Sequence, residues 1–130
     1  MHTILILILL GGKENYGEGE YLEYVFDTSE RDEHKLGITQ IIVANGYKKN
    51  KELWQDNSRV KRLKVYLNEK PFCIINLVDC YEFQKVDIDT IMLPQRGIMR
   101  LKFEIIDIYP GNKSKNTAIT ELLFDGIGVH

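Results

Sequence analysis

The chain has 130 residues, of which 44% are hydrophobic and 28% are charged, and it carries a net charge of −2 with only three prolines. This length and composition are typical of one folded domain with a real core, expected over residues 1–130, and they exclude global disorder. The slightly acidic balance also argues against a general attraction to nucleic acid or to anionic membranes.

The first segment is an unbroken apolar run from Ile4 to Leu10, followed by Gly11-Gly12. Such a run is compatible with the hydrophobic part of a short signal peptide, although no basic segment precedes it and no A-x-A cleavage site follows it. It is far shorter than the roughly 20 residues that a membrane span needs, so no span is expected. We favour a first core strand, because the isoleucine-rich alternation stops at a glycine pair, and a signal peptide is the alternative.

The rest of the chain has the apolar patterns that are typical of strands. Residues 38–44 are nearly all apolar, which predicts a central strand that is buried on both faces. In residues 60–68 the pattern alternates, so that Tyr66 lies with Lys64 on the polar face. Further strands are expected at residues 21–26, 72–78, 86–88, 99–108 and 118–124.

Turn signals and one phase slip refine this interpretation. Glu69-Lys70-Pro71 predicts the turn of a hairpin, and the slip of the apolar phase at Ile105-Ile106 predicts a β-bulge. Residues 47–59 are charged and have no period, so we expect a long loop there and no long amphipathic helix anywhere. About eight short strands separated by turns predict an all-β sandwich or jelly roll.

Neither the cysteines nor the histidines predict a chemical centre. Cys73 and Cys80 are expected in one extended segment, where about 3.3 Å per residue holds them too far apart for a disulfide. His2 and His130 are close to the ends of the chain and His34 is in a charged loop, so a shared metal or acid–base site is not expected. Common hydrolase, metalloprotease and nucleotide-binding motifs are absent from the sequence. We therefore expect neither enzyme activity nor a cofactor.

The loop over residues 45–59 is the first candidate for a binding site, because long loops on a rigid sandwich commonly carry binding groups. A sugar site needs an aromatic face for the sugar C–H groups, and amides or charged groups for its hydroxyls. Those residue types are supplied by Tyr47, Trp54, Asn57 and Arg59. A structural alternative is open for three of them: Trp54 caps the end of the sandwich, Arg59 binds carbonyls of the loop, and Asn57 forms a turn.

Basic residues outnumber acidic ones by seven to two between Lys48 and Lys64. A basic edge of this kind can meet an anionic sugar or phosphate, or it can simply keep an edge strand soluble. Nucleic-acid binding is not expected from so local an excess.

An ordered set of motifs resembles the NADase-type glycan-binding domain, a module of the galactose-binding-like or discoidin-like superfamily, over roughly residues 11–130. The first part of the set is Asn45-Gly46-Tyr47-x-Lys49, then Trp54-x-x-Asn57-Ser58-Arg59-Val60-Lys61, then Leu63-Lys64-Val65-Tyr66. The second part is Leu77-x-Asp79 with Gln84, Phe103-Glu104-Ile105, Asp107 to Gly111, and Thr117 to Leu122. Upstream of both stands Gly17-Glu18-Gly19-Glu20-Tyr21.

The resemblance implies a galactose-binding-like jelly roll that serves as an accessory domain, and it implies secretion or display at a cell surface. In a toxin that carries this module, NAD cleavage lies in a different domain, so that activity is not implied here. With the resemblance, the candidate ligand-binding residues lie on loops at one end of the sandwich: Tyr47, Lys49, Trp54, Asn57, Arg59 and Tyr109.

Related sandwiches often hold a structural calcium between their opening loop and a glutamate near the last strand. Glu121 matches that glutamate, but the apolar run before Gly11-Gly12 supplies no carboxylate. Asn116 also stands where the family more often has an aspartate. Because calcium takes six to eight oxygen ligands, the resemblance does not imply a bound calcium here.

Three functions compete at this point. A glycan-binding module predicts exposed aromatic side chains in a shallow groove. A structural or protein-interaction module predicts that Trp54 and Arg59 are buried, with an exposed patch elsewhere. An enzyme would need a deep pocket with converging titratable groups. We expect the first, with a glycan or a protein as partner, and nothing in the sequence sets an oligomeric state.

Overall fold

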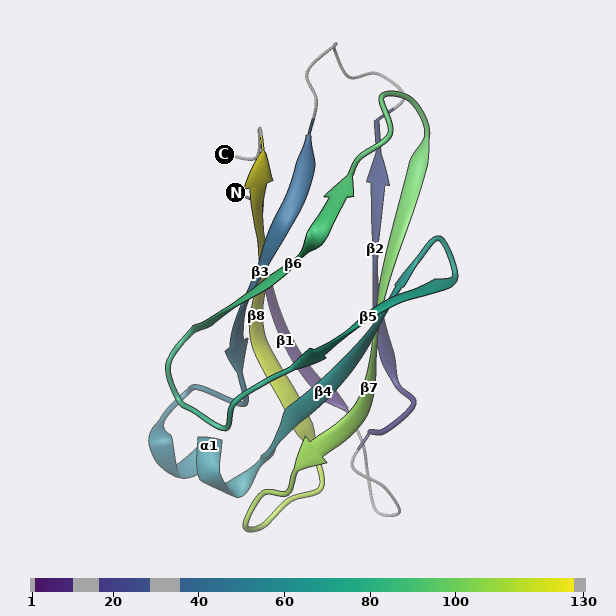
Figure 1. Cartoon of the computed structure of the whole chain (residues 1–130). Helices are drawn as coiled ribbons and strands as arrows, with labels where there is room; N and C mark the ends of the chain where they lie inside the picture. The colour runs from purple at the N-terminus through teal and green to yellow at the C-terminus, as the bar shows by residue number, and fades with distance from the viewer. Residues whose placement is uncertain (1, 11–16, 29–35, 128–130) are drawn as a thin grey trace.

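The computed structural model describes the backbone of residues 2–10 and the whole of residues 17–28 and 36–127. These residues form eight strands and one short helix (Figure 1). Their bounds are β1 His2–Leu10, β2 Tyr21–Asp27, β3 Gly37–Asn45, α1 Lys51–Asp56, β4 Ser58–Leu67, β5 Lys70–Asn76, β6 Gln84–Met92, β7 Ile98–Tyr109 and β8 Thr117–Ile127. The opening segment at residues 11–16, His34 and His130 lie outside the described residues.

The strands form two antiparallel layers that share one hydrogen-bonded network. The order is β5-β4-β7-β2 in one layer and β1-β8-β3-β6 in the other. The layers join along a short parallel contact between β4 and β8, where Ser58 pairs with Thr117 and Arg59 with Ala118. Helix α1 lies at one end of this sandwich, and the β4–β5 hairpin projects from its side (Figure 1).

The core lies between the layers and is built from alternate residues of each strand. In β7, Leu101, Phe103 and Ile105 are at most 1% exposed, whereas Lys102 and Glu104 between them are half-buried and Arg100 before them is exposed. Strand β3, which lies between β6 and β8, differs from β7 because its residues 41–45 are all buried. The predicted half-buried and fully buried strands are therefore confirmed, as is the all-β sandwich. Among the described residues, no helix is long and apolar enough to cross a membrane.

One local prediction about the strands is confirmed and one is wrong. In the β4–β7 pairing, Leu63 is opposite Ile105 and Arg62 is opposite Asp107, so Ile106 is the extra residue of the predicted β-bulge. The hairpin turn is not at residues 69–71, because Lys70 already pairs with Leu67. Its central residues are Asn68 and Glu69, whose φ values of 49° and 69° suit a two-residue turn.

The expected long loop at residues 47–59 contains a helix, and that expectation was wrong over residues 51–56. The Asn50 side chain accepts a hydrogen bond from the Leu53 backbone N–H at 2.8 Å and so caps the first turn. Strand β6 is also longer than the expected residues 86–88. Its pairing with β3 runs from Gln84 to Met92, because backbone hydrogen bonding continues beyond the apolar positions.

Both cysteines are free, as the sequence predicted. Burial, together with the charge of Asp89, raises the pKa of the Cys73 thiol. A raised pKa keeps this thiol protonated and unreactive at neutral pH, which suits a partly buried side chain packed against the core.

Tyr24 is a polar residue at the centre of the core. Its ring meets those of Phe103 and Phe124 edge to face, with centroid distances of 5.7 and 5.2 Å. The Tyr24 hydroxyl oxygen is buried and has no hydrogen-bond partner among the described residues. Burial raises the pKa of Tyr24 to about 12.

We expect Tyr24→Phe to retain the fold and to raise the free energy of unfolding by up to about 1 kcal/mol, because it removes an unsatisfied buried hydroxyl. Deprotonation of Tyr24 stabilises the unfolded chain from pH 10 upward, and the folded chain only from about pH 12. The wild type should therefore lose stability between these pH values, and the variant should lack this part of the loss. Urea unfolding at pH 8 and pH 11 measures both effects. A variant clearly less stable at pH 8 would contradict the expectation.

Candidate functional site

Arg59 organises the loop residues that the sequence singled out. Its Nε and Nη2 groups donate to the two carboxylate oxygens of Asp79 at 3.0 and 2.9 Å. Its Nη1 group donates to the backbone carbonyls of Trp54, Gln55 and Asn57 at 3.0–3.3 Å. Arg59 is only 8% exposed, so its side chain ties the end of α1 to the loop after β5.

Trp54 packs on this arginine. The Arg59 guanidinium carbon lies 4.3 Å from the centroid of the Trp54 ring, and the indole Nε1 donates to the Asn45 carbonyl at 3.0 Å. Gly46 has a φ of 85°, and a Cβ at that position would lie 2.5 Å from the indole ring. The indole, half-buried, therefore rests directly on the turn that follows β3.

The remaining predicted residues are divided between the interior and the surface. Asn57 is buried, and its amide donates to the Leu53 carbonyl at 2.9 Å. The Tyr109 hydroxyl donates to the Leu77 carbonyl at 2.7 Å. Tyr47 is half-buried and Lys49 is exposed. Four of the predicted residues thus meet at one end of the sandwich: Trp54, Asn57, Arg59 and Tyr109. Their polar groups are hydrogen-bonded within the protein.

Glu121 lies in the middle of β8, opposite Ala44 of β3 and Leu5 of β1. Within the part of the chain that the structure describes, no group of three or more histidine, cysteine or acidic residues is placed to hold a metal ion. The opening segment that would complete a calcium site lies outside that part.

Sequence reasoning missed two aromatic residues at the same end. Tyr81 and Phe83, in the loop between β5 and β6, surround the Lys48 ammonium, whose nitrogen lies 4.7 and 4.8 Å from their ring centroids. Tyr81 also meets the Trp54 ring edge to face at 5.8 Å. Phe83 is 50% exposed and Val78, in the same loop, is 66% exposed. We call Lys48, Val78, Tyr81 and Phe83 the loop-end patch.

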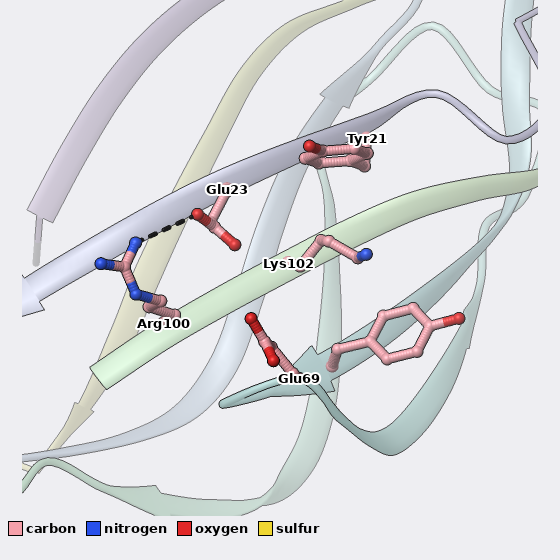
Figure 2. Close-up of a pocket in the computed structure, with 6 residues that line it drawn as sticks. Tyr21, Glu23, Glu69, Arg100 and Lys102 are labelled. Atoms are coloured by element: carbon pink, nitrogen blue, oxygen red, sulfur yellow. Dashed lines mark hydrogen bonds and ion pairs between the residues drawn. The ribbon is translucent and has the colours of Figure 1, made fainter. Parts of the chain in front are cut away.

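A hollow lies on the outer face of the β5-β4-β7-β2 layer. Cross-strand pairing sets Lys102 of β7 between Glu23 of β2 and Tyr66 of β4. The hollow is open and holds about 470 Å³ (Figure 2). We call it the sheet-face pocket, and it is lined by Tyr21, Glu23, Tyr66, Glu69, Arg100 and Lys102.

Charged neighbours hold the tyrosines of the sheet-face pocket in place. The Lys102 ammonium lies 4.7 Å from the ring centroid of Tyr21 and 4.8 Å from that of Tyr66, so it sits between the two rings. The Tyr66 hydroxyl donates to a Glu104 carboxylate oxygen at 2.8 Å, which orients the ring. Tyr21 is 56% exposed, so much of its surface is free to meet a ligand.

An ion pair closes the other side of the sheet-face pocket. Arg100 donates from Nη1 to a Glu23 carboxylate oxygen at 3.3 Å, as the dashed line in Figure 2 marks. Glu69 lines the same side from the turn between β4 and β5. The pocket thus combines two aromatic side chains with hydrogen-bond donors and acceptors, which are the groups that a sugar requires.

The signal that could have pointed to this pocket was a tyrosine on the polar face of each of two expected strands. Tyr66 was placed on the polar face of residues 60–68, and Tyr21 opens the strand at residues 21–26. The missing information was that β7 lies between these two strands and brings both tyrosines to one surface.

A family model described as the NAD glycohydrolase translocation F5/8 type C domain matches residues 10–125. The NMR structure of the Streptococcus pyogenes NAD+-glycohydrolase translocation domain is similar, with 22% identity and a TM-score of 0.51 over 86% of this chain and 91% of that one. A family 35 carbohydrate-binding module from an environmental isolate has 16% identity and a TM-score of 0.48 over 97% and 85%. No curated protein matches the chain. The family match and the S. pyogenes structure confirm the expected fold class.

Proposed function

Since the chain belongs to the NAD glycohydrolase translocation F5/8 type C domain family, as its motifs indicated, we propose that it is a non-catalytic module that binds a glycan. The family is one of translocation domains and is distinct from the domain that cleaves NAD. Its ligand, in this proposal, lies in the sheet-face pocket and not among the loop residues around Arg59.

The observation that carries the proposal is the pair of tyrosines in the sheet-face pocket. Tyr21 and Tyr66 come from two strands of one rigid layer, so folding sets their separation before any ligand arrives. Preorganised aromatic surfaces lose little conformational freedom on binding. The charged groups beside them offer both donors and acceptors to hydroxyl groups.

The burial of the loop residues supports the choice of this pocket. Arg59 and Asn57 are at most 9% exposed, and their polar groups bind carbonyls and the Asp79 carboxylate. A ligand could reach them only by breaking these hydrogen bonds. Of the loop set, Tyr47 and Lys49 have the more accessible side chains.

Protein interaction is the second candidate function, and the loop-end patch favours it. Val78 and Phe83 are exposed apolar side chains on one loop, and the Lys48 ammonium lies against the Phe83 ring. Exposed apolar groups beside a charged rim are typical of protein-binding surfaces. This surface lies at the α1 end of the sandwich, away from the sheet-face pocket.

A glycan array and calorimetric titration of the positive glycans test the proposal. We expect Tyr66→Ala to weaken binding at least about tenfold, because it removes one aromatic face and its contact area. Tyr47→Ala is the matched control at the loop end and should bind as the wild type does. Loss of binding in the folded Tyr47→Ala protein, with Tyr66→Ala unchanged, would move the site to the loops. An array without any binding would favour the protein-interaction function.

A further inference from the structure

The lining of the sheet-face pocket is balanced in charge. Glu23 and Glu69 contribute two carboxylates, and Arg100 and Lys102 contribute two cations. Two residues further along β4 and β7, Lys64 is opposite Glu104, and their charges also cancel. A pocket with this lining has no net attraction for an ion of either sign.

The four charges are not equally engaged. Arg100 and Glu23 form an ion pair with each other. Among the residues that the structure describes, the Lys102 ammonium lies over two aromatic rings but has no hydrogen-bond or ion-pair partner, and the Glu69 carboxylate has none either. One free donor group and one free acceptor group therefore line the same hollow as Tyr21 (Figure 2), and Tyr66 also lines it.

We infer that the ligand of this pocket is an uncharged sugar with neighbouring hydroxyl groups, an inference that rests on the glycan-binding function proposed above. A hydroxyl both donates and accepts, so adjacent hydroxyls can donate to Glu69 and accept from Lys102 while a sugar face packs on a tyrosine ring. Hydrogen bonds to charged groups are stronger than those between neutral groups, which suits a shallow and wet site.

An acidic sugar fits this lining less well. Its carboxylate would gain from Lys102 and Arg100 but would meet the carboxylates of Glu69 and Glu23 across the same hollow, so the lining would not offset the cost of removing that carboxylate from water. An anion would find a better place at the other end of the molecule, where Lys48, Lys49 and Lys51 follow one another closely in the sequence. Three of the seven basic residues noted in the sequence therefore belong to a different surface.

The test uses pairs of immobilised glycans that differ only in charge: terminal galactose against galacturonic acid, and terminal glucose against glucuronic acid. The wild type should prefer the neutral member of its pair at least about threefold, the size of one extra charge–charge contact near the surface. Glu69→Gln should reduce this preference and Lys102→Gln should increase it. Glu82→Gln and Lys49→Gln make the same charge changes on exposed residues away from the pocket and should leave the ratio unchanged.

Each result separates the inference from the function on which it rests. A wild type that prefers the acidic member, and loses that preference in Lys102→Gln, overturns the inference and leaves glycan binding in place. Binding that falls as salt rises from about 0.05 to 0.5 M would also contradict it, because an uncharged ligand forms no salt-screened ion pair. An array on which no glycan binds overturns the proposed function and the inference together.

Discussion

Arg59→Ala is expected to lower the free energy of unfolding by about 2–3 kcal/mol, because it removes a buried guanidinium and leaves three carbonyls and the more exposed Asp79 carboxylate without their donor. The variant loses both hydrogen bonds to Asp79 and the contacts to three carbonyls at the end of α1. It also leaves the Trp54 ring without the cation that packs on it. Urea unfolding followed by tryptophan fluorescence measures the change, and Trp54 is the chain's single reporter.

Arg62→Ala is the matched control for Arg59→Ala. Arg62 pairs with Asp107 at 3.4 Å, but its side chain is 44% exposed, whereas that of Arg59 is 9% exposed. An exposed ion pair contributes at most about 1 kcal/mol. Arg59→Lys should also destabilise the fold. A lysine has one nitrogen, which cannot replace the three guanidinium nitrogens that bind the Asp79 carboxylate and the three carbonyls. Equal losses for Arg59→Ala and Arg62→Ala would show that the Arg59 cluster is not structural.

Gly111→Ala is expected to destabilise the fold by about 1–3 kcal/mol, the usual range for forcing atoms into a filled site. An added Cβ would lie 2.4 Å from the Asp56 carbonyl oxygen and from the Asn57 carbonyl carbon. Both are backbone atoms at the end of α1, so no side-chain movement relieves the contact. The Gly111 N–H also donates to the Ser58 hydroxyl at 2.9 Å, which a backbone shift would break.

Thermal unfolding of Gly111→Ala beside Asn112→Ala isolates the steric effect. Asn112 is the next residue in the same loop and its side chain is exposed, so truncating it should change the melting temperature little. A Gly111→Ala protein as stable as Asn112→Ala would show that the loop after β7 can move away from α1 at little cost.

Most of the strands were predictable because each carries its burial pattern in its own residues. The alternation of Leu101, Phe103 and Ile105 against charged neighbours is a local signal, and so is the phase slip at Ile106. The extension of β6 to Gln84 and Met92 was not predictable, because it depends on pairing with β3. Likewise, the six-residue helix α1 is too short for an apolar period to be visible.

The candidate site was harder to predict, for a physical reason. Residue type alone indicates that Trp54, Arg59 and Tyr109 are suited to bind a sugar. It does not indicate whether their hydrogen-bond donors already have partners within the folded protein. That depends on the position of Asp79 and of several carbonyls, which are set by loops far apart in the sequence. The sheet-face pocket depends in the same way on the order of strands β2, β7 and β4.

Strand β1 finds its partner at the other end of the chain: His2 pairs with Phe124, and Leu10 with Thr117. During synthesis β1 therefore emerges before β8, with strands β2 to β7 between them. Until β8 has been made, the run from Ile4 to Leu10 lacks the strand with which it pairs. An apolar run without charge or proline readily pairs with copies of itself. We therefore expect the nascent chain to be prone to aggregation at this apolar run until β8 has been made and can pair with it.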